Sequence, residues 1–178
     1  MLCAEDTLLA DRKVFFNEEV TPESAVQLIQ ILIHLEKQDP GKEIKIYLNS
    51  PGGDVTSGLA VYDTIVGLKC PVRTVCLGTA ASMGSIIFLA GKHREILPHA
   101  EVMVHDPLIS GLKGAQKALA LEKEAEKLMK TREIIAKIIS ERTGHTLQEV
   151  YDITKEDHFF DAEEALAYGL ATEIVDHV

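Results

Sequence analysis

The sequence predicts a single α/β domain built around a largely parallel sheet, and two observations carry that prediction. Short β-branched and aromatic runs alternate with segments whose apolar residues recur at helical spacing, which is the pattern of right-handed βαβ crossovers. The chain has 178 residues, 46% of them hydrophobic, with no internal repeat or linker. That length and composition suit one substantial core, so we treat residues 1–178 as one domain.

The first half of the chain supplies most of this alternation. Thr21 and Pro22 have the residue types of a helix N-cap and first helical position, and Asp39 followed by Pro40 and Gly41 ends that helix. A glycine-rich turn, residues 49–54, follows the second strand. The predicted elements are strand 14–16, helix 22–38, strand 44–48, helix 59–68 and strand 71–77.

The second half is predicted to contain more helix than strand. The predicted elements after the turn at Ser82 are a helix over 86–90, strands 94–97 and 101–104, a long helix 114–142, a short helix 147–153, a loop 156–160 and a final helix 161–168. The long helix is unusual for so small a domain, and its apolar positions need to be covered. Projection against a second subunit and packing across its own sheet both remain open.

Composition argues against several classes of function. The formal net charge of -10 disfavours a dedicated binder of nucleic acid or anionic membranes. Cys3, Cys70 and Cys76 form neither a paired framework nor a CxxC motif, which favours a reducing compartment. Residues 1–13 lack the apolar core of a secretion signal, and the uncharged stretch 74–91 is interpreted as a buried strand, turn and helix rather than a membrane span. We therefore expect a cytoplasmic protein.

The small-residue stretch 78–85 is the most informative local feature. It predicts a strand that turns abruptly into a helix with Ser82 at the bend. A serine there lies near unpaired N–H groups, which suits either a mounted nucleophile or a helix cap. On this stretch alone, a cap formed by Ser82 or Ser85 is the favoured interpretation.

Three chemical types needed for acyl transfer occur at strand ends or in loops, where sites of parallel sheets gather. Ser82 is a potential nucleophile, His105 a potential base and Asp157 a potential partner for that base. The N–H groups of Gly53 and Met83 are the natural donors for an oxyanion. Taken singly, each residue has a commoner structural explanation: a turn glycine, a strand-end histidine or a solvated acid.

Metal and nucleotide chemistry are not expected. No pair of histidines has the spacing of a metal site, and the glycine-rich turn 49–54 lacks the lysine of a P-loop and the spacing of a dinucleotide fingerprint. We therefore predict no metal and no cofactor.

Four motifs in order give these residues a family context. The motifs are Ile46–Gly53, Thr79–Gly84, Val102–Pro107 and Asp161–Ala165 with Tyr168–Leu170. Together they resemble the ClpP family, the proteolytic subunits of ATP-dependent Clp proteases, from about Val14 to Val175. The Ser, His, Asp order along the chain is also that of this family.

The resemblance implies a fold, a mechanism and an assembly. The implied fold is of the ClpP/crotonase type, with stacked ββα units and a protruding handle at about residues 108–142. The implied roles are nucleophile for Ser82, general base and then acid for His105, orienting partner for Asp157, and oxyanion hole for the N–H groups of Gly53 and Met83. Peptides are expected to bind as an added strand along the segment after His105.

The implied assembly is a homo-oligomer of two face-to-face heptameric rings, a tetradecamer, that encloses the active sites. Narrow pores would restrict substrates to short peptides unless a partner AAA+ unfoldase feeds longer chains, and only that partner would use ATP. The sequence departs from the family pattern in its short segment before the first strand, in Asp106 where glutamine is usual, in the altered stretch Leu108–Gly114, and in Glu156 where arginine is common. His158, next to Asp157, is a candidate pH-dependent substitute for the lost arginine pairing.

The sequence therefore predicts a serine endopeptidase that hydrolyses peptides and unfolded polypeptides through an acyl-enzyme on Ser82. Two alternatives stay open. One is a catalytically weak structural subunit that assembles with a second, active ClpP-type subunit. The other is a crotonase-like acyl-CoA enzyme, whose chemistry uses paired N–H groups without needing a Ser, His, Asp set.

Overall fold

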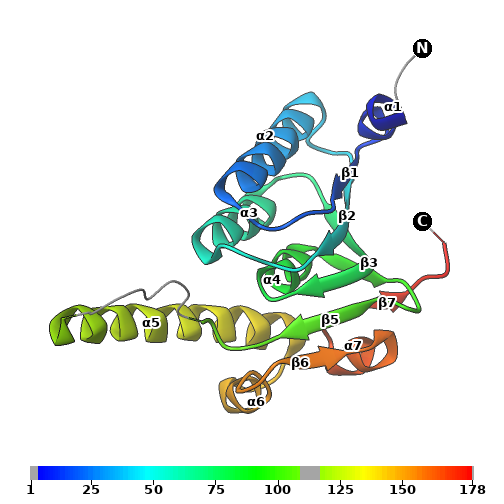
Figure 1. Ribbon diagram of the computed structural model, residues 1–178. Coiled ribbons are helices and arrows are strands. Elements are labelled where there is room, and N and C mark those ends of the chain that lie inside the picture. Colours follow the sequence, from blue (N-terminus) through cyan, green and yellow to red (C-terminus); the bar gives the residue numbers. More distant parts are fainter. Residues whose placement is uncertain (1–3, 109–116, 178) are drawn as a thin grey trace.

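The computed structural model describes residues 4–108 and 117–177 and is a mixed α/β structure (Figure 1). Its elements in order are α1 (Ala4–Ala10), β1 (Lys13–Phe16), α2 (Pro22–Gln38), β2 (Ile44–Ser50), α3 (Val55–Gly67), β3 (Val72–Ala81), α4 (Met83–Ala90), β4 (His93–Ile96), β5 (Glu101–Val104), α5 (Ala118–Thr143), α6 (Leu147–Ile153), β6 (His158–Phe160), α7 (Ala162–Tyr168) and β7 (Glu173–Ile174).

The sheet is mostly parallel, as the alternation of strands and helices predicts. Its strands run in the order β1-β2-β3-β4-β7, all paired in parallel. The C-terminal part of β3 also pairs in parallel with β5, and β6 is antiparallel to β5. β3 therefore serves two neighbours along one edge, β4 through residues 73–76 and β5 through residues 79–81.

Helices α2, α3 and α4 lie together along one side of the sheet (Figure 1). Helix α2 begins as the sequence predicts, because the Thr21 side chain accepts a hydrogen bond from the Ser24 N–H and the Ser24 hydroxyl accepts one from the Thr21 N–H. All eight residues of α4 are buried, so this helix lies within the core on every side. Ser85 is its one polar side chain. In the part of the chain that the structure describes, no helix is both long enough and apolar enough to cross a membrane.

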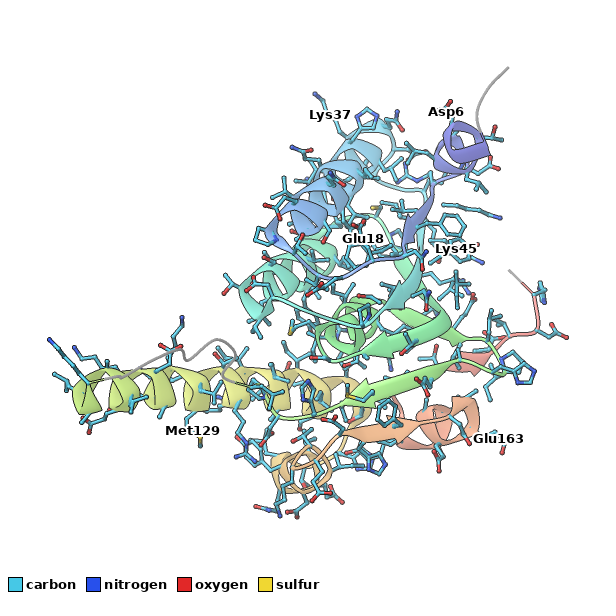
Figure 2. The ribbon with its side chains drawn as sticks, in the orientation of Figure 1. Asp6, Glu18, Lys37, Lys45, Met129 and Glu163 are labelled. Atoms are coloured by element: carbon cyan, nitrogen blue, oxygen red, sulfur yellow. The ribbon has the colours of Figure 1, made fainter. Side chains whose placement is uncertain are left out.

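Helix α5 packs on the body mainly through α4 and α6, and its cover by a second subunit stays a prediction. Its second half packs on the body through Ile135, Ala136, Ile138 and Ile139. From Ala118 to Lys127 every residue is exposed, and this half projects from the body (Figure 1), with Met129 further along the helix also 58% exposed (Figure 2). The predicted start of the helix at Gly114, and most of the altered stretch after Leu108, lie outside the described residues.

Three features of the fold differ from the sequence prediction. The predicted loop at residues 156–160 is wrong in part, because residues 158–160 form strand β6 on the edge of β5. Helix α1 and the two-residue strand β7 were not predicted. The strands β6 and β7 are short and form by pairing with strands that are distant in sequence, so local pattern carries little signal for them.

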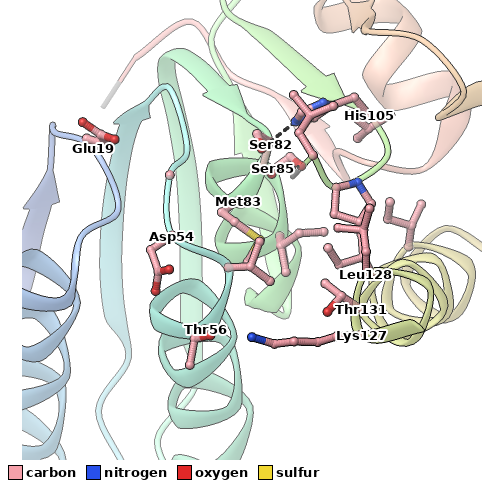
Figure 3. Close-up of a pocket in the computed structure, with 18 of the residues that line it drawn as sticks. Glu19, Asp54, Thr56, Ser82, Met83, Ser85, His105, Lys127, Leu128 and Thr131 are labelled. Carbon is pink, nitrogen blue, oxygen red and sulfur yellow. Dashed lines mark hydrogen bonds between the residues drawn. The ribbon is translucent and has the colours of Figure 1, made fainter. Parts of the chain in front are cut away.

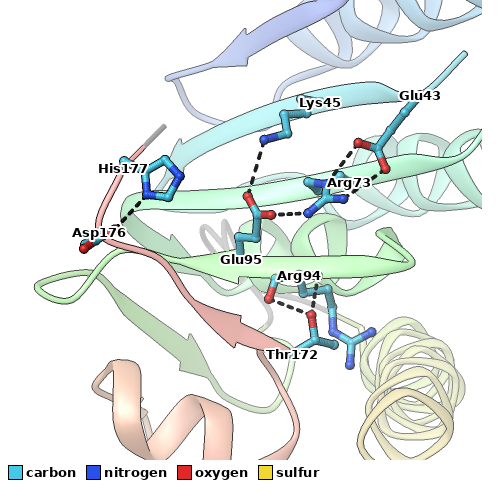
Figure 4. Close-up of polar contacts among 8 residues, drawn as sticks. All are labelled: Glu43, Lys45, Arg73, Arg94, Glu95, Thr172, Asp176 and His177. Atoms are coloured by element: carbon cyan, nitrogen blue, oxygen red, sulfur yellow. Dashed lines mark hydrogen bonds and ion pairs between the residues drawn. The ribbon is translucent and has the colours of Figure 1, made fainter.

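Charged residues form a network across the face of the sheet opposite to α4. The Glu95 carboxylate, almost fully buried, contacts the guanidinium of Arg73 and lies 3.7 Å from Lys45 Nζ (Figure 4). Arg73 also donates to Glu43 from its Nε at 3.0 Å, and this hydrogen bond is the main cause that raises the pKa of Arg73. The network joins three neighbouring strands by side-chain contacts in addition to their backbone hydrogen bonds.

Arg94 has no acidic partner among the described residues and instead donates to backbone carbonyls at the ends of three helices. Its Nε donates to Leu170 O at 2.7 Å, and Nη2 donates to Gly169 O at 3.0 Å and Arg142 O at 3.2 Å. Nη1 lies 3.4 Å from Gly91 O. These carbonyls lie at the C-terminal ends of α4, α5 and α7, where helix dipoles are negative. Burial lowers the pKa of Arg94, and nearby Arg142 adds to the effect.

Candidate active site

Ser82 occupies the sharp turn between β3 and α4. Its backbone has φ 52° and ψ -120°, a conformation that costs a residue other than glycine roughly 1–3 kcal/mol. The side chain makes no capping hydrogen bond, so the interpretation of Ser82 as a helix cap is wrong. Ser85 instead donates from its hydroxyl to Ser82 O at 2.6 Å and stabilises the turn. Because the Ser82 hydroxyl makes no capping bond, it is available for other contacts.

The structure brings Ser82, His105 and Asp157 together. His105 Nε2 lies 2.7 Å from Ser82 Oγ (Figure 3), and His105 Nδ1 lies 3.4 Å from Asp157 Oδ1. The His105 side chain is 14% exposed, whereas that of Asp157 is 63% exposed. The serine–histidine contact is therefore short and sheltered, and the histidine–aspartate contact is longer and open to solvent.

Strand pairing explains how a residue so distant in sequence reaches His105. β5 ends at Val104, directly before His105, and Val104 is paired with His158 of the antiparallel strand β6. Asp157 precedes His158, so the β5–β6 register places it beside His105. The side chain of His158 packs its ring against Phe160, with centroids 4.5 Å apart. The role of His158 as a pH-dependent substitute for the arginine pairing stays a prediction.

The glycine-rich turn lies directly against the Ser82 turn. A Cβ on Gly52 would lie 2.6 Å from Ala81 O, 2.7 Å from Ser82 Cβ and 2.9 Å from Met83 N. Two hydrogen bonds, Val20 N–H to Gly52 O and Asp54 N–H to Val20 O, flank Gly53 and hold the turn to the chain before α2. Because the flanking groups make these bonds, the N–H of Gly53 points away from Val20. Met83, the first residue of α4, has an N–H without an intrahelical acceptor.

A cavity of about 570 Å³ opens beside Ser82, between the turn region and α5. Its polar lining includes Asp54, Thr56 and Lys127 (Figure 3). The apolar lining is formed by Ile86, Val104, Leu128, Ile135 and Ile139. The cavity therefore offers an apolar space for a side chain next to the Ser82 turn.

Asp54, on the rim of this cavity, caps α3. Its Oδ1 accepts from the Ser57 hydroxyl at 2.6 Å and the Ser57 N–H at 2.8 Å, and these bonds, the hydroxyl first, hold the pKa of Asp54 below its ordinary value of 3.8. A carboxyl whose folded-state pKa is lowered contributes stability above its unfolded pKa and loses that contribution as the pH falls. The capping interaction is thus fully present at neutral pH.

We expect Asp54→Ala to lower the free energy of unfolding by about 1 kcal/mol at pH 7. The difference from the unchanged protein should shrink as the pH falls below 3.8, where the carboxyl becomes protonated. Urea denaturation followed at several pH values measures this. Asp63→Ala, which removes an exposed carboxylate late in the same helix, is the matched control and should cause no loss. A difference that grows on acidification would contradict the assignment.

In residues 4–108 and 117–177, no three side chains of histidine, cysteine, aspartate or glutamate are arranged to hold a metal ion.

Sequence reasoning did not anticipate the contacts of Asp106 with Arg132 of α5 and Thr154 of α6. No local sequence signal links these three positions.

Comparison with known families agrees with the geometry. A family model described as Clp protease matches residues 3–178, nearly the whole chain. The mixed α/β architecture with its mostly parallel sheet is consistent with the ClpP/crotonase fold that the sequence predicts. Because the match extends over far more than half of its length, the chain belongs to the Clp protease family.

Proposed function

We propose that this protein is a serine endopeptidase that hydrolyses peptides and unfolded polypeptides through an acyl-enzyme on Ser82. The observation that carries the proposal is the 2.7 Å contact between Ser82 Oγ and His105 Nε2 at a strained turn beside a cavity. Membership of the Clp protease family supports the same reaction class. It also favours peptide hydrolysis over the acyl-CoA chemistry of crotonase-like enzymes.

In the proposed reaction His105 Nε2 removes the proton from Ser82 Oγ as the oxygen attacks the carbonyl carbon of the peptide bond. Negative charge develops on the carbonyl oxygen, and the N–H groups of Gly53 and Met83 stabilise it. His105 then donates the proton to the leaving amine, which departs and leaves the acyl group on Ser82. Water, activated by His105, releases the carboxylic acid and restores the hydroxyl. Asp157 orients the imidazole and stabilises its charged form.

The proposed assembly is the pair of stacked heptameric rings implied by the family, with the active sites inside. The projecting half of α5, exposed from Ala118 to Lys127, supports a role as the element through which rings interlock. An AAA+ unfoldase would be the partner that feeds long substrates into the rings, and a second ClpP-type subunit would be the partner in a mixed ring. Analytical ultracentrifugation of the purified protein measures the oligomeric state directly.

Active-site labelling tests the proposal. A fluorophosphonate should label the purified, assembled protein at a single site, and Ser82→Ala should abolish labelling and reduce peptide hydrolysis by roughly 10³-fold or more. Ser85→Ala, which changes a neighbouring hydroxyl directed at Ser82 O, is the control and should remain labelled. Equal labelling of the unchanged protein and Ser82→Ala would overturn the assignment of the nucleophile.

A second candidate function is a structural ring subunit with little activity of its own. The observation that favours it is the long contact of 3.4 Å between His105 Nδ1 and Asp157 Oδ1, on an aspartate that is 63% exposed. In that case the protein alone would form assembled rings without labelling. Addition of an active ClpP-type subunit would then give mixed rings in which only the added subunit reacts.

A further inference from the structure

We propose that Asp106 is a positioning residue for the pair formed by His105 and Asp157, an inference that rests on the proposed function. Asp106 follows His105 directly, and its side chain bonds to two different helices. Arg132 Nε of α5 donates to Asp106 Oδ2 at 2.6 Å, and the hydroxyl of Thr154, at the end of α6, lies 2.8 Å from Asp106 Oδ1. Asp106 Oδ2 thus has a charged donor, and Asp106 Oδ1 shares the single hydrogen of the Thr154 hydroxyl with Val150 O, which lies 2.9 Å from that hydroxyl.

The backbone strengthens the same connection. The Asp106 N–H donates to Thr154 O at 2.7 Å, so Asp106 and Thr154 are joined by one backbone and one side-chain contact. Thr154 is almost fully buried and is the C-cap of α6, and its N–H donates to Val150 O. The position of Thr154 relative to the helix is thus fixed, and the contact transfers that fixed position to Asp106.

The two connections bracket the histidine–aspartate pair. On one side of His105, Val104 is paired with His158 through the β5–β6 register. On the other side, Asp106 is joined to Thr154. The short segment from Thr154 to His158 carries Asp157 between these two anchors. Removing one anchor leaves an exposed aspartate held from one side only, where small displacements carry it away from His105.

Arg132 is itself held on two sides. Its guanidinium lies 4.2 Å from the centroid of the Tyr151 ring of α6, in addition to its bond with Asp106. Tyr151 belongs to the helix that ends at Thr154. Arg132 therefore ties the strand end after His105 to the same helix by a second route, and the Asp106 carboxylate is the group that both routes share.

Kinetics of the assembled protein test this role. Asp106→Ala and Thr154→Val should lower kcat for a short fluorogenic peptide by about 10- to 100-fold, because a displaced catalytic group slows the chemical step. KM should change less than kcat, since the side chains of Asp106 and Thr154 do not line the cavity beside Ser82. Thr154→Ser, which keeps the hydroxyl, should restore most of the activity. Unchanged kcat in assembled Asp106→Ala, or equal losses in Thr154→Ser and Thr154→Val, would overturn the proposal.

A matched control lies one residue further along α5. Glu133 accepts from Lys137 Nζ at 2.6 Å, so Glu133→Gln removes an ion pair of the same length on the same helix without touching the strand end after His105. Its kcat should equal that of the unchanged protein. A fall as large as that of Asp106→Ala would show a general effect of α5 charges and would refute the specific role.

Hydrogen exchange separates this inference from the proposed function. Peptides that cover residues 154–158 should exchange faster in Asp106→Ala than in the unchanged protein or Glu133→Gln, whether or not the protein hydrolyses peptides. Absence of fluorophosphonate labelling in the unchanged protein would contradict the proposed function. Equal exchange in all three proteins would contradict the positioning role of Asp106, even with full activity.

Discussion

Gly52→Ala is expected to reduce kcat/KM for peptide hydrolysis by about 10²-fold or more. Gly52 has φ 92°, which alanine rarely adopts, and its added Cβ would lie 2.7 Å from Ser82 Cβ and 2.9 Å from Met83 N. The methyl group can be accommodated only if the glycine turn and the Ser82 turn separate. That movement displaces the nucleophile and both proposed oxyanion donors at once. Steady-state kinetics and the rate of fluorophosphonate labelling both measure the loss.

Gly67→Ala is the matched control for this substitution. A Cβ on Gly67, the last residue of α3, would have no atom within 4 Å, and the residue has ordinary helical geometry. Activity should be unchanged, and the free energy of unfolding should rise by roughly 0.5–1 kcal/mol because alanine favours the helix. Full activity of Gly52→Ala in assembled protein would contradict the close approach of the two turns as a catalytic requirement.

Arg94→Met is expected to cause the largest loss of stability, about 1–3 kcal/mol in the free energy of unfolding. Methionine fills much of the volume, but it leaves the buried carbonyl of Leu170 and the partly buried carbonyls of Gly169 and Arg142 without their donor. Burial of unpaired carbonyls is costly because water cannot replace the lost partner. Urea denaturation at neutral pH measures the change.

Two further variants define the origin of this loss. Lys92→Met removes an exposed cation two residues earlier and should change stability by less than about 0.5 kcal/mol. Arg94→Lys keeps the charge but not the branched set of donors, so we expect it to lie between the other two. A stability of Arg94→Lys equal to that of the unchanged protein would show that charge alone, rather than the several hydrogen bonds, holds the helix ends.

Most of the fold could be predicted from the sequence because its longer elements carry strong local signals. Thr21 and Pro22 mark the start of α2, and Gly144 ends α5 in the left-handed conformation that glycine favours. The alternation of short apolar runs and helices indicated a parallel sheet, and the structure has that sheet. The three-residue strand β6 escaped prediction because only its pairing with β5 makes it a strand.

The candidate site was predicted less completely, and the reason is again distance along the chain. Ser82 could be picked out because small residues surround it, whereas His105 and Asp157 gained weight only from the order of motifs. Nothing local indicates that Asp106 meets Arg132 and Thr154, since these residues come from separate elements. Such contacts depend on the packing of α5 and α6 against the strand end.

The antiparallel pairing of β5 with β6 also has a consequence for when the three site residues can come together during synthesis. Ser82 and His105 belong to neighbouring strands, but Asp157 reaches them only after the whole of α5 and α6 has been synthesised and β6 has found its edge. Closing so long a loop is among the slower steps of folding. A nascent chain released early from the ribosome would therefore carry the proposed nucleophile Ser82 without its proposed orienting carboxylate, Asp157.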